Sequence, residues 1–161
     1  ALKDYRTSDL FRELYAHVPF DWVMFANSFT IFRHPREILS FMDQLDSHGV
    51  GIINSAVFHG GFLTGGDKFD YREVDPDSAF GGELHAWRKS FQGLCREFNI
   101  PPADAALHFA LSHPAIVSIA LNTSKPEKMN RNVEILNQEI QGSFWTALKE
   151  KRLIDSAYNY L

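Results

Sequence analysis

Three short apolar runs, each about one strand long, constrain the fold of this chain more than any other feature. They cover residues 22–26, 50–54 and 116–121, and small or polar residues follow each of them. Continuous apolar runs of this length are typical of parallel strands that are buried on both faces. Because helical patterns separate the runs, we predict an α/β fold with about three parallel strands, right-handed crossovers and flanking helices.

Capping residues and apolar stripes at helical spacing predict helices around these strands. We expect the helices over residues 8–17, 35–48, 83–98, 101–111, 124–136 and 143–153. Gly49 and Asn99 stand where the second and third helices should stop in a left-handed conformation. The connection over 57–82 contains three glycine pairs and no periodic pattern, so we expect a long loop that is functional or disordered.

Composition limits the class of protein. A chain of 161 residues with 45% hydrophobic content can bury a full core, which predicts one domain over 1–161. The net charge of -4 has no strong local block behind it, so we expect neither nucleic acid nor a membrane surface as the partner. No apolar run approaches the ~20 residues of a membrane span. The single cysteine, Cys95, falls on the apolar side of a helix, which predicts a packing role and a cytoplasmic location.

Three parallel strands would leave two open sheet edges, which folded proteins rarely expose. The first predicted element is a helix that no strand precedes. A complete (β/α)8 barrel needs roughly 250 residues. We therefore expect the C-terminal part of a TIM barrel, whose partner is the missing N-terminal half. The alternative is a self-contained three-stranded domain that dimerises to cover its edges.

Residues 118–133 read as the end of a strand, a tight turn and the start of a helix. Ser124 is the expected N-cap, and Pro126 and Glu127 suit the first helical turn. Free backbone N–H groups at such a point bind a phosphate well. The polar side chains around it are Thr123, Ser124, Lys125, Lys128 and Arg131. An ordinary capped helix with a solvated basic face is the alternative.

The chain resembles the C-terminal half of the aldo-keto reductase family, and most of all its branch of sugar dehydrogenases, which includes L-fucose and D-threo-aldose dehydrogenases. Residues 48–64, which read HGVGIINSAVFHGGFLT, are similar to the seventh strand of that branch and its following loop. Residues 94–114 resemble its seventh helical layer. The strand and turn over 118–133 resemble its eighth strand and adenosine-binding turn.

This resemblance implies that the whole protein is an NAD(P)-dependent oxidoreductase. It would transfer a hydride between a nicotinamide and the carbonyl carbon of a sugar or a related small molecule. The family's catalytic Asp, Tyr, Lys and His fall upstream of residue 1, so we expect no catalytic residue in this chain and no activity of the chain alone. A non-catalytic binding or regulatory protein on the same fold is the alternative.

The resemblance also assigns site residues. The residues expected to contact the cofactor are Asn27, Ser28, Ser55, Ala56, Val57, Phe58, Gly60, Asn122, Thr123, Ser124, Lys128 and Asn132. Asn122 stands where many members keep a lysine for the 2′-phosphate of NADP, so NAD and NADP both remain possible, with Lys125 and Lys128 as substitutes for that lysine. Ser55 stands where many members keep a tyrosine on the nicotinamide.

The resemblance places three further residues beside the substrate, namely His59, Tyr158 and Tyr160. A solvated loop histidine is the alternative for His59, and packing on the barrel exterior is the alternative for the two tyrosines. We expect no metal site, because His108 and His113 have no partnering acid at ligand spacing.

Overall fold

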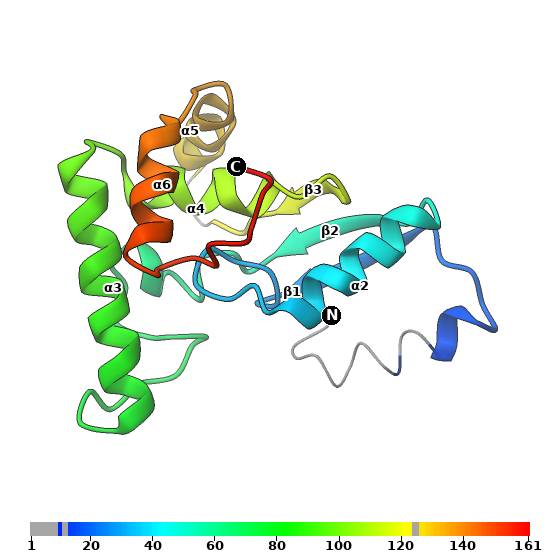
Figure 1. Ribbon diagram of the computed structural model, residues 1–161, viewed down its shortest axis with the longest axis horizontal. Coiled ribbons are helices and arrows are strands. Elements are labelled where there is room, and N and C mark those ends of the chain that lie inside the picture. Colours follow the sequence, from blue (N-terminus) through cyan, green and yellow to red (C-terminus); the bar gives the residue numbers. More distant parts are fainter. Residues whose placement is uncertain (1–9, 11–12, 124–125) are drawn as a thin grey trace. The chain divides into compact units, whose positions relative to one another are not determined.

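The computed structural model describes residues 10, 13–123 and 126–161, and it contains a parallel sheet with helices around it (Figure 1). The strands β1 (Trp22–Ala26), β2 (Gly51–Ser55) and β3 (Ile116–Ala120) are parallel and lie side by side in chain order. The helices are α2 (Arg36–Ser47), η1 (Phe62–Thr64), α3 (Ala79–Glu97), α4 (Pro102–Leu111), α5 (Glu127–Leu136) and α6 (Gly142–Glu150). The predicted three-stranded α/β fold is confirmed.

The chain divides into two compact units, which are described separately below. The first unit comprises residues up to 57, 109–122 and 160, and it contains the whole sheet and α2. The second unit comprises residues 58–108, 123–159 and 161, and it contains α3, α5, α6 and most of α4. The predicted helix over 8–17 lies partly outside the described residues; helical structure is present at 10 and 13–15.

In the first unit, α2 runs along the sheet and covers one of its faces (Figure 1). Its apolar stripe, Ile38, Phe41, Met42 and Leu45, is buried. The ring of Phe41 stacks on that of Phe25 in β1, with the centroids 6.0 Å apart. Pro35 fixes the start of the helix, and Gly49, at φ 73°, turns the chain into β2, as the sequence predicts.

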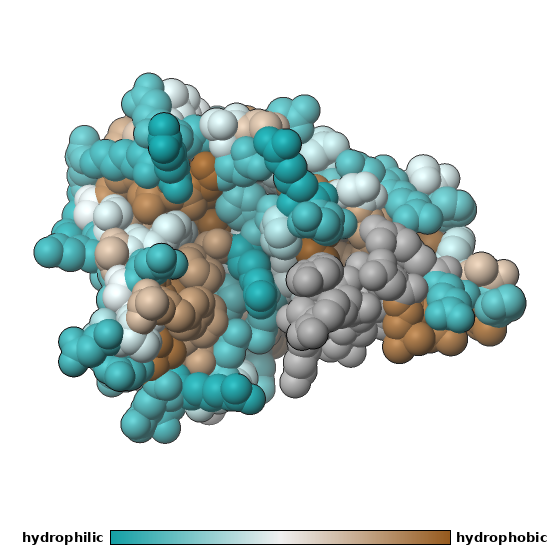
Figure 2. All heavy atoms as spheres, turned by 60° about the horizontal axis from the view of Figure 1, so that its bottom comes forward, coloured by the Kyte–Doolittle hydropathy of each residue, from teal (hydrophilic) through white to brown (hydrophobic). Residues whose placement is uncertain are grey.

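The expectation that the strands are buried on both faces is wrong for the described chain. Side chains alternate between the two faces of a strand; β1 and β2 each bury only one alternating set, and β3 buries only Ile116. In β1, Val23 and Phe25 are buried, whereas Trp22 and Met24 are 59% and 43% exposed. The physical reason is that α2, the helix of this unit, packs on one face of the sheet. On the side of the molecule drawn in Figure 2, hydrophobic side chains reach the surface in separate patches.

The second unit is held together by contacts between α3 and the C-terminal segment. The indole N–H of Trp87 donates to the backbone oxygen of Leu153 at 3.0 Å, and Phe98 packs edge-on against Phe144. Cys95 is buried on the same helix, which confirms its packing role. Burial raises the pKa of its thiol to about 12, so almost no reactive thiolate forms at neutral pH.

Helix α3 begins at Ala79, four residues before the start at Glu83 that we predict from the sequence, where the glycine pair at 81–82 indicates a loop. The side-chain oxygen of Ser78 caps it by accepting from the backbone N–H of Gly81 at 3.1 Å. Gly81 is required by packing, because a Cβ there would overlap the carbonyl oxygen of Asp75. The connection over 57–82 is therefore shorter and more ordered than expected, with η1 and a bridge between Phe69 and Arg72 inside it.

No helix in the described part of the chain has both the length and the hydrophobicity that crossing a membrane requires.

Two glycines of α3 give opposite predictions for the same substitution. Gly81→Ala should lower the free energy of unfolding by about 2 kcal/mol, because the added methyl overlaps the backbone at Asp75. Gly93→Ala should raise it by about 0.5–1 kcal/mol, because nothing lies within 4 Å of a Cβ there and alanine favours a helix interior. Urea denaturation of both variants measures the two shifts. Equal effects of the two substitutions would contradict the packing described for Gly81.

Candidate functional site

The three strands end in one row. Ala26 pairs with Ser55, and Ser55 pairs with Ala120 in the register of the parallel sheet. The residues that follow them, Asn27, Ala56 and 121–122, therefore leave the sheet at a common edge, which we call the carboxyl edge. Ligands of parallel α/β folds bind at this edge, because loops and side chains rather than packed helices surround it.

Asn27 combines a strained backbone with an unsatisfied side chain. Its φ of 57° lies in the left-handed region, and its backbone N–H donates to the Ser55 oxygen at 3.2 Å. Its side-chain oxygen is buried and accepts no hydrogen bond from the described residues. A buried amide oxygen without a donor is costly, so a ligand N–H at this point would be stabilised.

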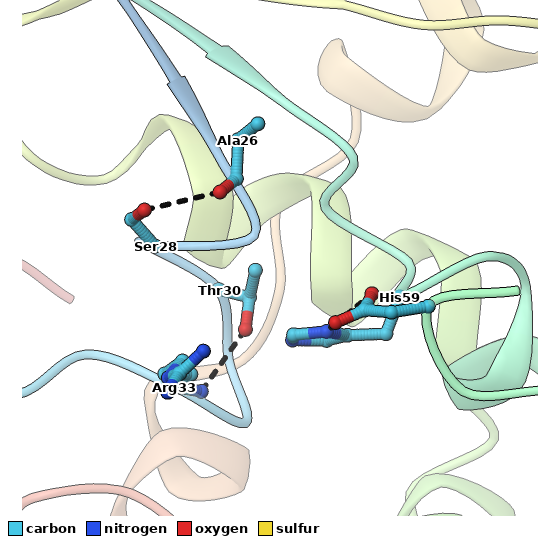
Figure 3. A network of polar contacts seen from close by, with 6 residues as sticks. Ala26, Ser28, Thr30, Arg33 and His59 are labelled. Atoms are coloured by element: carbon cyan, nitrogen blue, oxygen red, sulfur yellow. Dashed lines mark hydrogen bonds and ion pairs between the residues drawn. The ribbon is translucent and has the colours of Figure 1, made fainter. Parts of the chain in front are cut away.

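Ser28 and the loop behind it are tied to the main chain. The Ser28 hydroxyl donates to the Ala26 oxygen at 3.0 Å, and the Arg33 N–H donates to the Thr30 hydroxyl at 3.0 Å (Figure 3). The Thr30 N–H donates to the Arg33 oxygen at 2.7 Å, which closes the loop. These hydrogen bonds tie the loop that carries Asn27 and Ser28 to the end of β1.

Asn54, which the sequence analysis does not name as a site residue, supports this edge through two buried hydrogen bonds. It is fully buried within β2, and its side-chain amide donates to the backbone oxygens of Phe29 at 2.9 Å and Ala110 at 3.1 Å. An asparagine inside an otherwise apolar strand is the one signal in the sequence. The amide joins β2 to the loop after β1 and to the end of α4.

Ser55, Ala56 and Val57 continue the edge in the first unit. The Ser55 hydroxyl donates to the Phe25 oxygen at 2.7 Å, and Ala56 has a φ of 56°. Val57 is 1% exposed. The hydrogen bond of Ser55 fixes the end of the strand, and the proposed cofactor contacts of all three residues stay predictions.

In the second unit, residues 58–66 form a compact turn. The backbone oxygen of Phe58 accepts from the N–H groups of Gly61 and Leu63, and that of His59 accepts from Phe62. Among the backbone hydrogen bonds of the described residues, none has the N–H of Phe58 or Gly60 as its donor. Two N–H groups so close together on a turn suit an oxyanion such as a phosphate.

The ring of His59 is fully buried, which excludes a solvated loop histidine. Its Nδ1 lies 3.0 Å from the carboxylate of Asp70, and Phe69 stacks on it with ring centroids 4.4 Å apart and planes 12° apart. Figure 3 draws this ring and its polar contact. The carboxylate can only accept a hydrogen bond, so Nδ1 carries the proton.

The adenosine turn is described only in part. Asn122 is exposed and Thr123 is half-buried, but Ser124 and Lys125 lie outside the described residues, as does the side chain of Lys128. Helix α5 begins at Glu127 with Pro126 as its N-cap residue. The predicted N-cap, Ser124, lies outside the described residues. Asn132 is half-buried on α5.

Arg131, expected among the cations around the phosphate, pairs with Asp104 instead. Its guanidinium lies 3.6 Å from the Asp104 carboxylate, and Asp104 itself is buried on α4. Burial raises the pKa of Asp104, while Arg131 and then His108 oppose that shift. The pair joins α4 to α5 and so supports the helix that carries Asn132.

The two tyrosines proposed to line the substrate pocket belong to different units. Tyr158 is buried in the second unit. The Tyr160 hydroxyl donates to Asp43 on α2 at 3.3 Å, and its ring lies 4.7 Å from that of His113, which precedes β3. Burial lowers the pKa of His113, opposed by Asp43, whose carboxylate lies 3.2 Å from Nε2.

No cluster of three or more histidine, cysteine, aspartate or glutamate side chains able to hold a metal ion occurs among the described residues.

Comparison with known proteins agrees with the resemblance seen in the sequence. Residues 6–153 match the aldo/keto reductase family. The chain is 31% identical over 118 residues to a pyridoxal 4-dehydrogenase of Microbacterium luteolum, an alignment that covers 71% of this chain and 33% of that protein. It is 25% identical over 152 residues to a D-threo-aldose 1-dehydrogenase of a Pseudomonas species, covering 91% of this chain and 44% of that protein.

A solved structure has the same fold. An aldo-keto reductase from Bacillus halodurans, in its holo form, matches 94% of this chain and 49% of its own length, with a TM-score of 0.67 and 16% identity. The predicted match to part of a (β/α)8 barrel is confirmed by this likeness. The chain spans less than half the length of each of these relatives.

Asn54→Ala should lower the free energy of unfolding by about 2–4 kcal/mol. The substitution leaves two backbone oxygens, those of Phe29 and Ala110, without their buried donor and creates a small cavity. The matched control is Asn137→Ala, whose exposed amide donates to Val133 and whose loss should cost about 0.5 kcal/mol at most. Chemical denaturation measures both. Equal costs would show that Asn54 does not brace the edge.

Arg131→Ala should destabilise the protein by about 1 kcal/mol at pH 7, because it leaves the buried Asp104 carboxylate without its cation. The pKa of Asp104 is already raised in the folded state, and loss of Arg131 raises it further. The cost is therefore present while Asp104 is ionised and disappears as the pH falls and the carboxyl protonates.

The control for this pair is the same substitution in an Asp104→Asn background, where it should cost little at any pH. Melting temperatures of the four variants, measured between pH 4 and pH 7, complete the cycle. A cost that is independent of both pH and Asp104 would contradict the pairing.

Proposed function

Because the chain belongs to the aldo/keto reductase family, we propose that it is part of an NAD(P)-dependent oxidoreductase that acts on a sugar aldehyde, a sugar lactol or a related carbonyl. The observation that carries the proposal is the buried side-chain oxygen of Asn27 at the carboxyl edge, which has no hydrogen-bond partner among the described residues. The carboxamide of a nicotinamide supplies an N–H donor that would satisfy this oxygen. Ser28, Ser55, Ala56 and Val57 would line the same end of the cofactor.

The second unit would hold the phosphates and the adenosine. The N–H groups of Phe58 and Gly60 would donate to the pyrophosphate, which fits the observation that no backbone oxygen in the described part of the chain accepts from them. The residues proposed to hold the adenosine end are Asn122 of the first unit with Thr123, Ser124, Lys128 and Asn132 of the second. With Arg131 paired to Asp104, a 2′-phosphate would depend on Lys125 or Lys128, and NAD and NADP both remain candidates.

The nicotinamide, when bound, supplies or accepts the hydride. The acid or base that moves the proton is the tyrosine of the family's Asp, Tyr, Lys and His set, which we place in the part of the relatives' length that this chain does not span. This chain would bind and orient the cofactor and form part of the substrate wall. By itself it would not turn over substrate.

For the substrate, a sugar is the leading proposal, as the likeness to a D-threo-aldose 1-dehydrogenase supports. The likeness to a pyridoxal 4-dehydrogenase makes a non-sugar carbonyl the other candidate. We keep His59 as a proposed substrate residue, because the turn that carries it resembles the family's loop beside the substrate. Tyr158 and Tyr160 stay proposed residues of that wall, and Tyr160 would reach it only by leaving its contact with Asp43. A cytoplasmic location fits the free, buried thiol of Cys95.

The proposal is tested by assaying the whole protein with NAD and with NADP against pentoses, 6-deoxy sugars and pyridoxal, following absorbance of the reduced cofactor. Turnover of a sugar with either cofactor supports it. Turnover of pyridoxal alone would keep the oxidoreductase and change the substrate. Cofactor binding without turnover of any carbonyl, in a protein that has the four catalytic residues, would favour the non-catalytic alternative.

Asn132→Ala should weaken NAD(P)H binding by ~1–3 kcal/mol if the amide contacts the adenine, because the adenine would lose a buried partner. The matched control is Asn130→Ala on the exposed side of the same helix, which should leave the affinity unchanged. Fluorescence titration of the whole protein with NADH and NADPH measures both. Unchanged affinity of the Asn132 variant would remove this residue from the site.

A further inference from the structure

Two consecutive left-handed residues lie in the segment that packs beside the 58–66 turn. Asp70 and Tyr71, at φ 49° and 67°, are both left-handed, and they form the tip of a two-residue turn between Phe69 and Arg72. Phe69 and Arg72 exchange both backbone hydrogen bonds, at 2.9 and 3.0 Å. Positive φ at both central residues is typical of a type I′ hairpin turn, where asparagine and glycine are preferred. Tyrosine is unusual there, and such strain persists where surrounding contacts or function require it.

This strained turn makes three contacts with His59, two hydrogen bonds and one ring stack. The Asp70 carboxylate accepts from the Nδ1 of His59, and the Asp70 backbone N–H donates to the His59 oxygen at 3.1 Å. The Phe69 ring covers one face of the imidazole. His59 itself is left-handed, at φ 51°, so both residues of the His59–Asp70 contact have a strained backbone conformation.

The contacts of Asp70 and Phe69 with His59 affect the backbone conformation of the 58–66 turn. His59 stands between Phe58 and Gly60, the two residues whose N–H groups have no backbone acceptor among those described. Gly60 is left-handed as well, and a Cβ there would lie 3.1 Å from the Tyr71 nitrogen, so the two turns touch. Loss of the left-handed φ of His59 would change the direction of the two N–H groups relative to each other.

We infer that Asp70 is a positioning residue for the cofactor: through the ring and the backbone of His59 it holds the N–H groups of Phe58 and Gly60 ready for an anionic ligand. The ligand is the pyrophosphate of the dinucleotide, and in this respect the inference rests on the proposed function. Asp70 itself does not touch the ligand. Its carboxylate fixes the Nδ1-protonated tautomer of His59, and Phe69 fixes the plane of the ring.

Two variants of Asp70 separate the carboxylate from the backbone strain. Asp70→Gly removes the acceptor while allowing the left-handed backbone, and Asp70→Asn keeps an acceptor oxygen at the same place. The matched control is Asp67→Asn, an exposed acid of the same connection. The measurements, made on the whole protein, are fluorescence titration with NADH and NADPH, steady-state kinetics, and ¹⁵N spectra of labelled histidine with the His59 signals assigned by a His59→Gln variant.

Asp70→Gly should weaken NAD(P)H binding about tenfold, because the hydrogen bond between His59 and the charged Asp70 no longer holds the turn in its binding conformation. The value of kcat at saturating cofactor should change by about twofold at most. Asp70→Asn should stay within about threefold of the original affinity, and Asp67→Asn should match it. The His59 spectra should show protonated Nδ1 in the original protein and in Asp70→Asn, and a tautomer mixture in Asp70→Gly.

Unchanged cofactor affinity of Asp70→Gly would overturn the inference, and so would a His59 tautomer that is the same in all variants. The spectra need no cofactor, so the two proposals can fail separately. If the tautomer shifts as expected but the original protein binds neither nicotinamide dinucleotide, the grip on His59 stands while the proposed function and the role toward the cofactor fall.

Discussion

The amide of Asn54 is the interaction on which the carboxyl edge depends. It lies inside β2 with no exposure and donates to two backbone oxygens that come from distant parts of the chain, those of Phe29 and Ala110. Without a donor each of these oxygens would be a buried, unsatisfied acceptor. One side chain therefore fixes the loop after β1 and the end of α4 against the middle strand, and the loop carries Asn27 and Ser28.

Left-handed residues mark the places where the chain leaves this scaffold. Asn27 and Ala56 follow two neighbouring strands, and Asn27 is held by its bond to the Ser55 oxygen. In the second unit His59 and Asp70 are left-handed and contact each other. Non-glycine residues adopt this conformation at a cost, which local hydrogen bonds offset here. Asn27 and Ala56 are proposed to contact the cofactor, and His59 and Asp70 to support such contacts, whereas the left-handed Asn99 and Arg152 follow the ends of α3 and α6 and have no proposed role.

The sequence predicts the three strands to within one or two residues and the helix α2 at both ends, because apolar runs, Pro35 and Gly49 are local signals. It also locates the carboxyl edge, since polar residues follow each strand. It misplaces the start of α3, because the glycines at 81–82 serve close packing against Asp75 and not a loop. The prediction that both sheet faces are buried is wrong, because within the first unit α2 packs on one face of the sheet only.

The grip of Asp70 on His59 and the pairing of Arg131 with Asp104 join residues that are distant in sequence. Local patterns contain no information about such contacts, so no reading of motifs could have found them. The family resemblance, by contrast, came from motifs and is confirmed by the match over residues 6–153.

The most direct test of the account is a crystal structure of the whole protein with NADP or NAD bound. The account predicts a nucleotide at the carboxyl edge, a hydrogen bond from the carboxamide to the side-chain oxygen of Asn27, and phosphate oxygens on the N–H groups of Phe58 and Gly60. A nucleotide bound elsewhere, or one that leaves Asn27 and both N–H groups without a contact, would contradict it.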